Sequence, residues 1–454
     1  MAVHRIRRGL DLPLCGAPRP GSPEAKPVSR VGVLADEVRG GKLRALVQPG
    51  DRVRRGAPLL EDRQRKGLYV TAPAGGRVSA VHRGDRRRLQ SVTIEIEDDD
   101  AQSFTLNRAE DDGDALRALL LETGLWTALR ERPFERTPDP AGEPHALFVT
   151  ALDTQPHAPD LNSTLLGREE DFERGLAAVT RLTRGTTFVC ARRGERPPLG
   201  TASVSLEEFE GPHPSGNVGL HIQLLAPVHR GRSVWHLGAQ EVAEIGYLLA
   251  HGTLDRARVV SFAGPGVVNP RLLRLRMGAN VDDVVADELK PGEQRVVSGS
   301  VLHGHVARGD VGGWLGRHHQ QISVLSEDRE RYALRWLRPG FDRYSFTPVF
   351  AASLLALLRR WMAKPPTARD LTTTLSGGPR AIVPIGAYER VMPYDVLPTH
   401  LLRAVSVGDL EWAEQLGALE LSEEDVALCT FVCPGKVDYG ERLRAVLDAL
   451  EQGA

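Results

Sequence analysis

The sequence predicts a multidomain α+β protein with a β-rich module first, layered α/β structure in the middle and a helical domain last. Three observations predict this fold class. The chain has 454 residues, a length typical of about three domains. Its first hundred residues are dense in turns, whereas helical patterns alternate with short apolar runs after residue 114. Apolar residues make up 41% and charged residues 26% of the chain, as in ordinary soluble globular proteins.

Residues 41–96 carry the evidence for the β-rich module. Pro49 and Gly50 are turn formers placed between single apolar residues. Residues 71–78 break one apolar run and begin another, and residues 91–96 alternate strictly with period two. We therefore expect a compact all-β module built of short strands.

The middle of the chain alternates helices with buried strands, which is typical of a βαβ-type layered domain. The apolar patterns predict helices over 114–132, 169–182 and 241–251, and strands over 145–151, 186–191 and 259–262. Residues 264–335 are again β-rich, glycine-rich and irregular. In the last hundred residues we expect helices over 348–362, 398–416 and 439–451, with a loop over 364–374.

The charge of the chain is sorted along its length. The formal net charge of −1 provides no global field to steer nucleic acid, so we expect no nucleic-acid partner. Residues 1–94 hold 20 Lys and Arg against 8 Asp and Glu, a net charge of +12, and residues 95–114 hold one Arg against nine acids, a net charge of −8. This shift predicts a domain boundary near residue 100. The basic module is either a solvated surface or a docking surface.

Neither a membrane span nor a secretory signal is expected. The longest apolar stretch, 349–358, ends at two arginines and is shorter than the roughly 18 residues that a spanning helix needs. The first 14 residues are charged and poor in apolar side chains, unlike a signal peptide. Four cysteines without regular spacing favour a reducing compartment. We expect a cytoplasmic protein.

Two cysteines near the C-terminus form the most suggestive chemical fragment. Cys429 and Cys433 lie four residues apart and Pro434 follows, as at the end of an iron–sulfur ligand run. A cluster needs four ligands, however, and Cys15 and Cys190 lie in other predicted modules. A pair of ordinary buried thiols is the favoured interpretation. No Gly-x-Gly-x-x-Gly opens a helix after a strand, so the dinucleotide fingerprint is missing.

Histidines cluster in two places, as His303 and His305 and as His318 and His319. Alternate histidines on one strand could face one metal ion, but no Cys, Asp or Glu stands at a supporting spacing. We interpret them as surface or interface histidines.

An aromatic and cationic string spans residues 124–134. Trp126, Arg130 and Phe134 recur every four residues and would share one helical face if the helix reaches Pro133. Core packing accounts for the two aromatic rings. A flat apolar ligand with carbonyl groups, such as a quinone, would also want an aromatic wall and a guanidinium donor. Both interpretations stay open.

Several long segments resemble one protein family, the A subunits of the bacterial sodium-translocating NADH:quinone reductase. These segments run in order over nearly the whole chain: 5–13, 124–134, 144–153, 211–214, 234–238, 259–265, 297–302, 381–386, 388–393 and 427–436. The resemblance implies a peripheral subunit on the cytoplasmic side of the bacterial inner membrane. It belongs to a six-subunit complex that passes electrons from NADH to ubiquinone and exports sodium. No complete catalytic site is expected on this chain alone.

The resemblance extends to the NADH- and flavin-binding subunit of respiratory complex I and to the C subunit of the Rnf complex, and it implies four domains. They are a biotinyl/lipoyl-carrier-like barrel-sandwich module over 1–100, a Rossmann-like α/β domain over 101–255, a β-grasp-like, soluble-ligand-binding module over 256–345, and a C-terminal helical domain over 346–454 with a degenerate iron–sulfur motif.

The cofactor motifs of those relatives are missing from this sequence. Where their flavin loop needs glycines, the chain has larger side chains such as Thr127 and Leu129. Lys66 lacks the neighbours of a biotin or lipoate attachment site. Side chains without a thiol stand at the other positions of the two cluster runs: Ile382, Ile385, Tyr388, Met392, Glu423 and Val426. We expect no cofactor on this chain, with flavins and iron–sulfur centres on its partner subunits.

Two functions stay open. In the first, the chain contacts ubiquinone through the face of Trp126, Arg130 and Phe134. In the second, it is a non-catalytic assembly scaffold without a ligand of its own. In either case the basic module, with the arginines at 86–88, is a candidate face towards anionic lipid headgroups or acidic partner loops.

Overall fold

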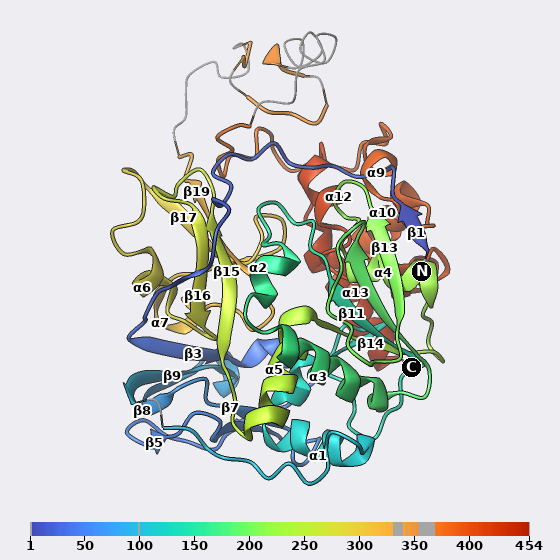
Figure 1. Ribbon diagram of the computed structural model, residues 1–454. Helices are drawn as coiled ribbons and strands as arrows, with labels where there is room; N and C mark the ends of the chain where they lie inside the picture. Colours follow the sequence, from blue (N-terminus) through green and yellow to red (C-terminus); the bar gives the residue numbers. More distant parts are fainter. Residues whose placement is uncertain are drawn as a thin grey trace.

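The computed structural model describes residues 2–98, 100–329, 339–341, 343–347, 349–352 and 368–453. The described residues form four β-sheets and a group of C-terminal helices. In Figure 1 the blue β module lies beneath the yellow sheet of the third module, and the green α/β domain lies beside the orange and red C-terminal helices. The chain is thus a multidomain mixed α/β protein. The boundaries at 100, 255 and 345 stay predictions.

Two antiparallel sheets form the first module, in the orders β3-β9-β8-β5 and β4-β6-β7. Their strands are β3 (Arg30–Leu34), β4 (Leu43–Ala45), β5 (Arg52–Val53), β6 (Pro58–Asp62), β7 (Tyr69–Thr71), β8 (Gly75–Arg83) and β9 (Leu89–Asp98), with the short 3-10 turns η1 (Ala35–Glu37) and η2 (Asp85–Arg87). Val31, Leu59, Leu60, Val92 and Ile94 are fully buried between the sheets. A core shared by the two sheets explains why such short strands are stable together.

The first 25 residues cross to other modules. Strand β1 (Val3–Arg5) adds a parallel edge to the α/β sheet, and β2 (Glu24–Ala25) adds one to the third sheet. The predicted module over 1–100 therefore holds its sheets from Arg30 onward, while the residues before it form an N-terminal strap. The hydrogen-bond partners of this strap lie about 200 and 250 residues away in sequence, which is why no local pattern predicts it.

Six strands make the sheet of the α/β domain, in the order β1-β13-β12-β11-β14-β10. All neighbours are parallel except β10 and β14. The strands are β10 (Arg130–Arg132), β11 (Ala146–Ala151), β12 (Thr186–Arg192), β13 (Ser205–Glu210) and β14 (Val234–Gly238). The helices are α1 (Gly113–Glu122), η3 (Leu125–Ala128), α2 (Leu161–Leu165), α3 (Glu169–Val179), η4 (Thr180–Leu182), α4 (Val218–Leu225) and α5 (Ala239–His251).

The strand order of this sheet reverses beside β11. The chain continues from β11 to β12 and β13 on one side and returns to β14 on the other. In parallel α/β sheets, ligands bind in the crevice at such a switch point, outside the carboxyl ends of the strands. The topology therefore directs attention to the residues that follow β11 and β14.

The predicted helix over 114–132 is wrong beyond its first nine residues. Helix α1 ends at Glu122, and Gly124 adopts a left-handed φ of 73° that terminates it. A short 3-10 turn follows, and Arg130 then pairs with His236 as β10 adds an antiparallel edge to β14. In residues 130–132, backbone hydrogen bonds are made by pairing with β14 and not within a helix. Trp126, Arg130 and Phe134 consequently do not share a helical face.

The remaining predicted elements of the middle region are confirmed. Strands β11, β12 and β15 cover the predicted strands, α3 with η4 covers 169–182, and α5 covers 241–251. Strand β11 is buried along nearly its whole length, which matches its continuous apolar run.

The third module holds a sheet of order β18-β17-β19-β15-β16-β2. Its elements are β15 (Ala257–Ala263), β16 (Arg271–Arg276), α6 (Val281–Val285), β17 (Gln294–Ser298), β18 (His305–Val306), α7 (Gly309–Gly312) and β19 (Gln321–Ser326). Phe262, Leu273 and Ile322 are fully buried in its core. Over residues 264–329, which the structure describes, this confirms the β-rich, irregular character predicted for 264–335.

The C-terminal domain consists of short helices packed around one core. They are α9 (Ala387–Val391), α10 (Pro398–Val407), α11 (Leu410–Gln415), η6 (Ala418–Glu420), α12 (Ala427–Val432) and α13 (Tyr439–Gln452). Helix α13 confirms the prediction over 439–451. The predicted helix over 398–416 is two helices, because Gly408 takes a φ of 74° and ends α10.

Two predictions near residue 360 are only partly covered. Most of the predicted helix over 348–362 lies outside the described residues. Of the predicted loop over 364–374, residues 368–374 are described, and they form isolated bridges at Arg369 and Thr372. In the part of the chain that the structure describes, no helix has the length and apolar character to cross a membrane.

Candidate functional site

A cavity of about 320 Å³ opens at the carboxyl ends of β11 and β14. Asp153 and Gln155 follow β11, and Gly238 lies between β14 and α5. The other walls come from the start of α4, from the third module at 299–303 and 318–321, and from the helical domain at 422–424. This volume is at the small end of ligand pockets, which run from about 300 to 1,000 Å³. The cavity is thus placed at the switch point and is sized for a small ligand.

Cationic and neutral donors line one side of the cavity. The Arg130 guanidinium, on β10, donates from Nε to His318 Nε2 at 3.1 Å, while its Nη1 has no partner among the described residues. Burial lowers the pKa of Arg130. Burial, with the Arg130 charge adding to it, holds the pKa of His318 well below its usual range. His318 is therefore a neutral imidazole at pH 7, and Arg130 carries the charge.

One carboxylate of the cavity is firmly ionised. Glu135 lies 2.7 Å from Arg132 Nε and 3.2 Å from His236 Nε2. Burial opposes ionisation, but His236 and Arg132 hold the pKa of Glu135 well below its usual range. The Glu135 carboxylate is therefore engaged in ion pairs within the protein.

Two other acids of the cavity, Asp153 and Glu424, form no salt bridge with a Lys or Arg among the described residues. Burial raises the pKa of Asp153 to about 6. Burial and the neighbouring charges of Asp425 and Glu135 raise the pKa of Glu424 to about 8. The basic group beside Glu424 is His303, whose Nε2 lies 4.0 Å from the carboxylate. At pH 7 the cavity therefore contains a protonated carboxyl group.

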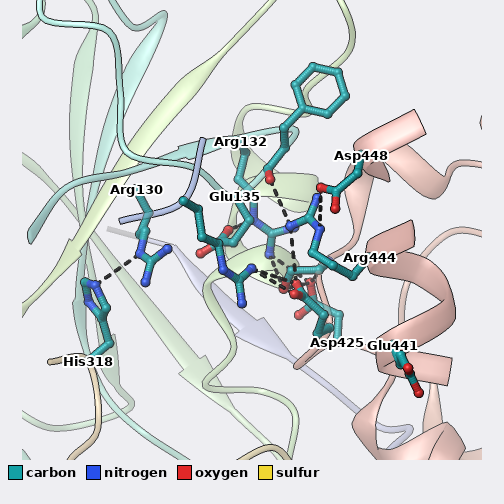
Figure 2. Close-up of polar contacts among 12 residues, drawn as sticks. Arg130, Arg132, Glu135, His318, Asp425, Glu441, Arg444 and Asp448 are labelled. Carbon is teal, nitrogen blue, oxygen red and sulfur yellow. Dashed lines mark hydrogen bonds and ion pairs between the residues drawn. The ribbon is translucent and has the colours of Figure 1, made fainter. Parts of the chain in front are cut away.

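A buried ionic network continues from the cavity residues Arg130 and Glu135 to the helical domain. Figure 2 shows Arg130 reaching His318 on one side, and Arg132 and Glu135 leading to Asp425 on the other. Arg132 Nη2 lies 2.8 Å from Asp425 Oδ2, and these side chains are 1% and 0% exposed. Asp425 also accepts a hydrogen bond from the Ser422 backbone N–H at 2.8 Å. The network fixes the helical domain against β10.

Of the three residues predicted to contact a quinone, the cavity contains Arg130 alone. Trp126 is 0% exposed in the core shared with the β module, where its Nε1 donates to the Pro138 carbonyl at 2.9 Å. Phe134 packs against the core of the helical domain and lines two clefts outside the cavity. The aromatic wall expected for the ligand is therefore not present at Arg130.

Several cavity residues were not predicted from the sequence. Asp153 and His236 lie at the carboxyl ends of buried strands, and that position was a usable signal for a ligand crevice. Glu424 comes from a helical domain far along the chain, and its arrival in the cavity depends on domain packing. No local pattern indicates it.

His318 and His319, interpreted from the sequence as surface or interface histidines, are half-buried where the third module meets the α/β domain. The cavity is lined by His303, His318 and His319. His319 Nδ1 lies 2.9 Å from Ser298 Oγ. His305 packs its ring 5.3 Å from that of His319. Among the described residues, no group of three or more His, Cys, Asp or Glu could hold a metal ion.

The two cysteines of the degenerate motif are buried free thiols. The Cys433 thiol lies 3.2 Å from Tyr388 Oη and 3.5 Å from Tyr439 Oη, and Cys429 lies 3.9 Å from Met392 Sδ. Tyr388 and Met392 stand where the first cluster run of the relatives would need cysteines. Phenols and a thioether occupy the space beside the thiols, and these residues do not fit an iron–sulfur cluster, which needs four thiolates.

The fold and the cavity define a class of protein: a multidomain mixed α/β protein with a polar cavity at the switch point of its α/β domain. Family models match three successive parts of the chain. They are described as the NqrA N-terminal barrel-sandwich hybrid domain over residues 4–97, the NqrA second alpha/beta domain over 111–254, and the NQRA C-terminal domain over 259–309.

Curated relatives match the chain over its full length. The A subunit of the Na(+)-translocating NADH-quinone reductase of Yersinia pseudotuberculosis serotype I (strain IP32953) is 46% identical, covering 99% of each chain. The A subunits of Cellvibrio japonicus and of Pseudomonas aeruginosa strain UCBPP-PA14 are 44% and 45% identical. Among solved structures, an NAD+-reducing [NiFe]-hydrogenase chain is similar over 48% of each chain, with 15% identity and a TM-score of 0.35. This chain belongs to the family of A subunits of the Na(+)-translocating NADH-quinone reductase, an oxidoreductase complex.

Proposed function

We propose that this chain is a peripheral subunit on the cytoplasmic face of a six-subunit sodium-translocating NADH:ubiquinone reductase, and that its cavity receives the quinone head group. The single observation that carries the quinone contact is the buried Arg130 guanidinium, which lines the cavity and whose Nη1 has no partner among the described residues. A quinone carbonyl is the acceptor that such a donor lacks. Four free cysteines accord with a reducing compartment.

The flavins and iron–sulfur centres of the reaction belong, in this proposal, to partner subunits. This chain would hold the quinone while electrons arrive from outside it. The third module contains a sheet whose edge strands are β2 and β18. We propose that this module is β-grasp-like, as the family resemblance implies.

Binding of ubiquinone-1 to the purified chain tests this function. We expect saturable binding with one site, and we expect Arg130→Gln to weaken it about 10-fold, because a hydrogen bond from a charged donor is worth about 1.5–3 kcal/mol and 1.4 kcal/mol is tenfold. Arg403→Gln, at an exposed arginine of α10, is the matched control and should bind as the wild type does. Absence of saturable binding to the wild type would contradict the proposal.

The second candidate function is an assembly scaffold without a ligand. The observation that favours it is the set of contacts between modules. The N-terminal strap pairs with the sheets of the α/β domain and of the third module, and the buried pair of Arg132 and Asp425 joins the α/β domain to the helical domain. A scaffold predicts that Arg130→Gln leaves quinone reduction by the whole complex unchanged. It also predicts that the complex dissociates when this chain is removed.

A further inference from the structure

We propose that Glu424 is the proton donor to a quinone reduced in this cavity. The inference rests on the proposed quinone binding and adds a residue role to it. Reduction of a quinone to a quinol consumes two electrons and two protons, so a quinone site needs a local acid as well as a carbonyl donor. The cavity supplies the donor in Arg130, and its wall from the helical domain supplies the acid.

Ion pairing distinguishes Glu424 from three other acids of the cavity. Glu423 lies 2.8 Å from Arg39, Glu135 lies 2.7 Å from Arg132, and Glu241 lies 3.1 Å from Arg258. Each of these three carboxylates forms an ion pair with an arginine. Asp153 has no such pair, but its Oδ1 accepts a hydrogen bond from the Gln155 backbone N–H at 2.7 Å, and the Arg192 charge favours its ionised form. The side chain of Glu424 lines the cavity, is 31% exposed, and has His303 at 4.0 Å as its basic neighbour.

Glu424 and its neighbour Asp425 are hydrogen-bonded to the start of α4, which places Glu424 at the cavity wall. Asn217, at the start of α4, donates from Nδ2 to the Glu424 carbonyl at 3.4 Å and to Asp425 Oδ1 at 3.2 Å. Asp425 is anchored in turn by Arg132. Precise placement of an acid is a requirement of general acid catalysis, because the proton must be within hydrogen-bond reach of its acceptor.

The charges that face Glu424 come from every neighbouring element. Its own segment contributes the carboxylates of Glu423 and Asp425, the segment around β10 contributes Glu135 and Arg132, and the loop after β11 contributes Asp153. Arg39, beside η1, and His303, from the third module, complete the set. Because carboxylates outnumber cations here, and because partial burial removes water from the carboxyl group, the protonated form of Glu424 is favoured at pH 7.

The step balances with the reaction of the family. Two electrons reach the quinone from NADH by way of the partner subunits. The O–H bond of Glu424 breaks as an O–H bond forms on the quinone oxygen nearest to it. The Glu424 carboxylate then recovers its proton from solvent on the side of His303, whose imidazole is 27% exposed. The second proton of the quinol comes from solvent.

The test uses the assembled reductase carrying Glu424→Gln in this chain. Glutamine keeps the shape of the side chain and removes the acid. We expect kcat for reduction of ubiquinone-1 by NADH to fall about 10²-fold, the size of effect that general acids produce. Binding of ubiquinone-1 to the purified variant chain should stay within about twofold of the wild type. Glu424→Asp should recover part of kcat.

The pH profile separates proton donation from a structural role. The wild-type kcat should fall as pH rises above about 8, because the donor loses its proton there. In Glu424→Gln this alkaline limb should be missing. Glu411→Gln, at an exposed carboxylate of α11, is the control. It should keep the wild-type kcat and the fall in kcat at alkaline pH.

The outcomes distinguish this inference from the proposed function. If the wild-type chain does not bind ubiquinone-1, both are overturned. If binding and the full wild-type rate profile persist in Glu424→Gln, the quinone site stands and Glu424 is not the donor. If the variant loses binding together with kcat, Glu424 is a ligand contact, and the donor role is again overturned.

Discussion

At the scale of single residues, a buried charge pair lies at the contact between two domains of this chain. Arg132 and Asp425 are almost completely buried and lie 2.8 Å apart. Ser422 Oγ accepts a hydrogen bond from Arg132 at 3.0 Å, and Asn217 Nδ2 donates one to Asp425 at 3.2 Å. A buried ion pair is satisfied only when both partners are present, because each charge alone has lost its hydration.

Removal of one charge from this pair should destabilise the protein strongly. We expect Asp425→Asn to lower the free energy of unfolding by about 3 kcal/mol, since Arg132 would keep a buried positive charge with half of its compensation. Urea unfolding followed by circular dichroism measures this. Asp448→Asn removes a partner of Arg444 that is 56% exposed and should change stability by less than about 1 kcal/mol. Equal effects of the two variants would show that burial of the pair is unimportant.

At the scale of elements, the α/β domain depends on a close crossing of α3 and α5. Both helices carry a glycine at the contact. A Cβ on Gly175 would lie 2.0 Å from the Val242 carbonyl oxygen, and one on Gly246 would lie 1.7 Å from the Asp171 carbonyl oxygen. The two backbones are therefore in direct contact, and the position of α5, whose first residues line the cavity, depends on this contact.

An alanine at the crossing should push the helices apart. We expect Gly175→Ala to cost about 1–3 kcal/mol in the free energy of unfolding, the usual range for overpacking, despite the better intrinsic helix preference of alanine. Thermal unfolding would detect it. Gly312→Ala is the matched control, because nothing lies within 4 Å of the added Cβ; it should be neutral within about 0.5 kcal/mol. A neutral Gly175→Ala would mean that the helices can separate without loss.

At the scale of the whole molecule, charge is concentrated on the first module. The turn η2 carries exposed arginines at its tip, and Arg86 and Arg87 take left-handed φ values of 52° and 60° that project this turn from the strands. Arg88 pairs with Asp36, but these side chains are 72% and 68% exposed, and an exposed pair of this kind is weak. We propose that this surface docks on acidic loops or anionic lipid in the membrane complex.

Reversal of these charges should weaken assembly of the complex. We expect the combined variant Arg86→Glu, Arg87→Glu and Arg88→Glu to dissociate from the other subunits at physiological salt, and to dissociate further as salt rises, because exposed charges are screened. Co-purification of tagged complex at two salt concentrations measures this. Arg403→Glu should assemble as the wild type does. If the triple variant assembles as the wild type does, the basic module does not dock on the rest of the complex.

The sequence by itself determined the elements whose stabilising contacts are local or whose burial is complete. Strands such as β11 and β12 were predictable because a strand buried on both faces has a continuous apolar run. Helices α5 and α13 were predictable from their 3.6-residue apolar pattern. The ordered family segments also identified the family, which the full-length relatives confirm.

Only the tertiary structure decided the site. The segment after Gly124 is a 3-10 turn and a strand because β14 supplies hydrogen bonds from about 100 residues away, and a local pattern contains no information about such a partner. The same holds for the N-terminal strap and for the position of His318 and His319 in the cavity wall. Glu424 and Arg130 face one cavity because the helical domain packs against the switch point, and that packing depends on charges brought together by the whole chain.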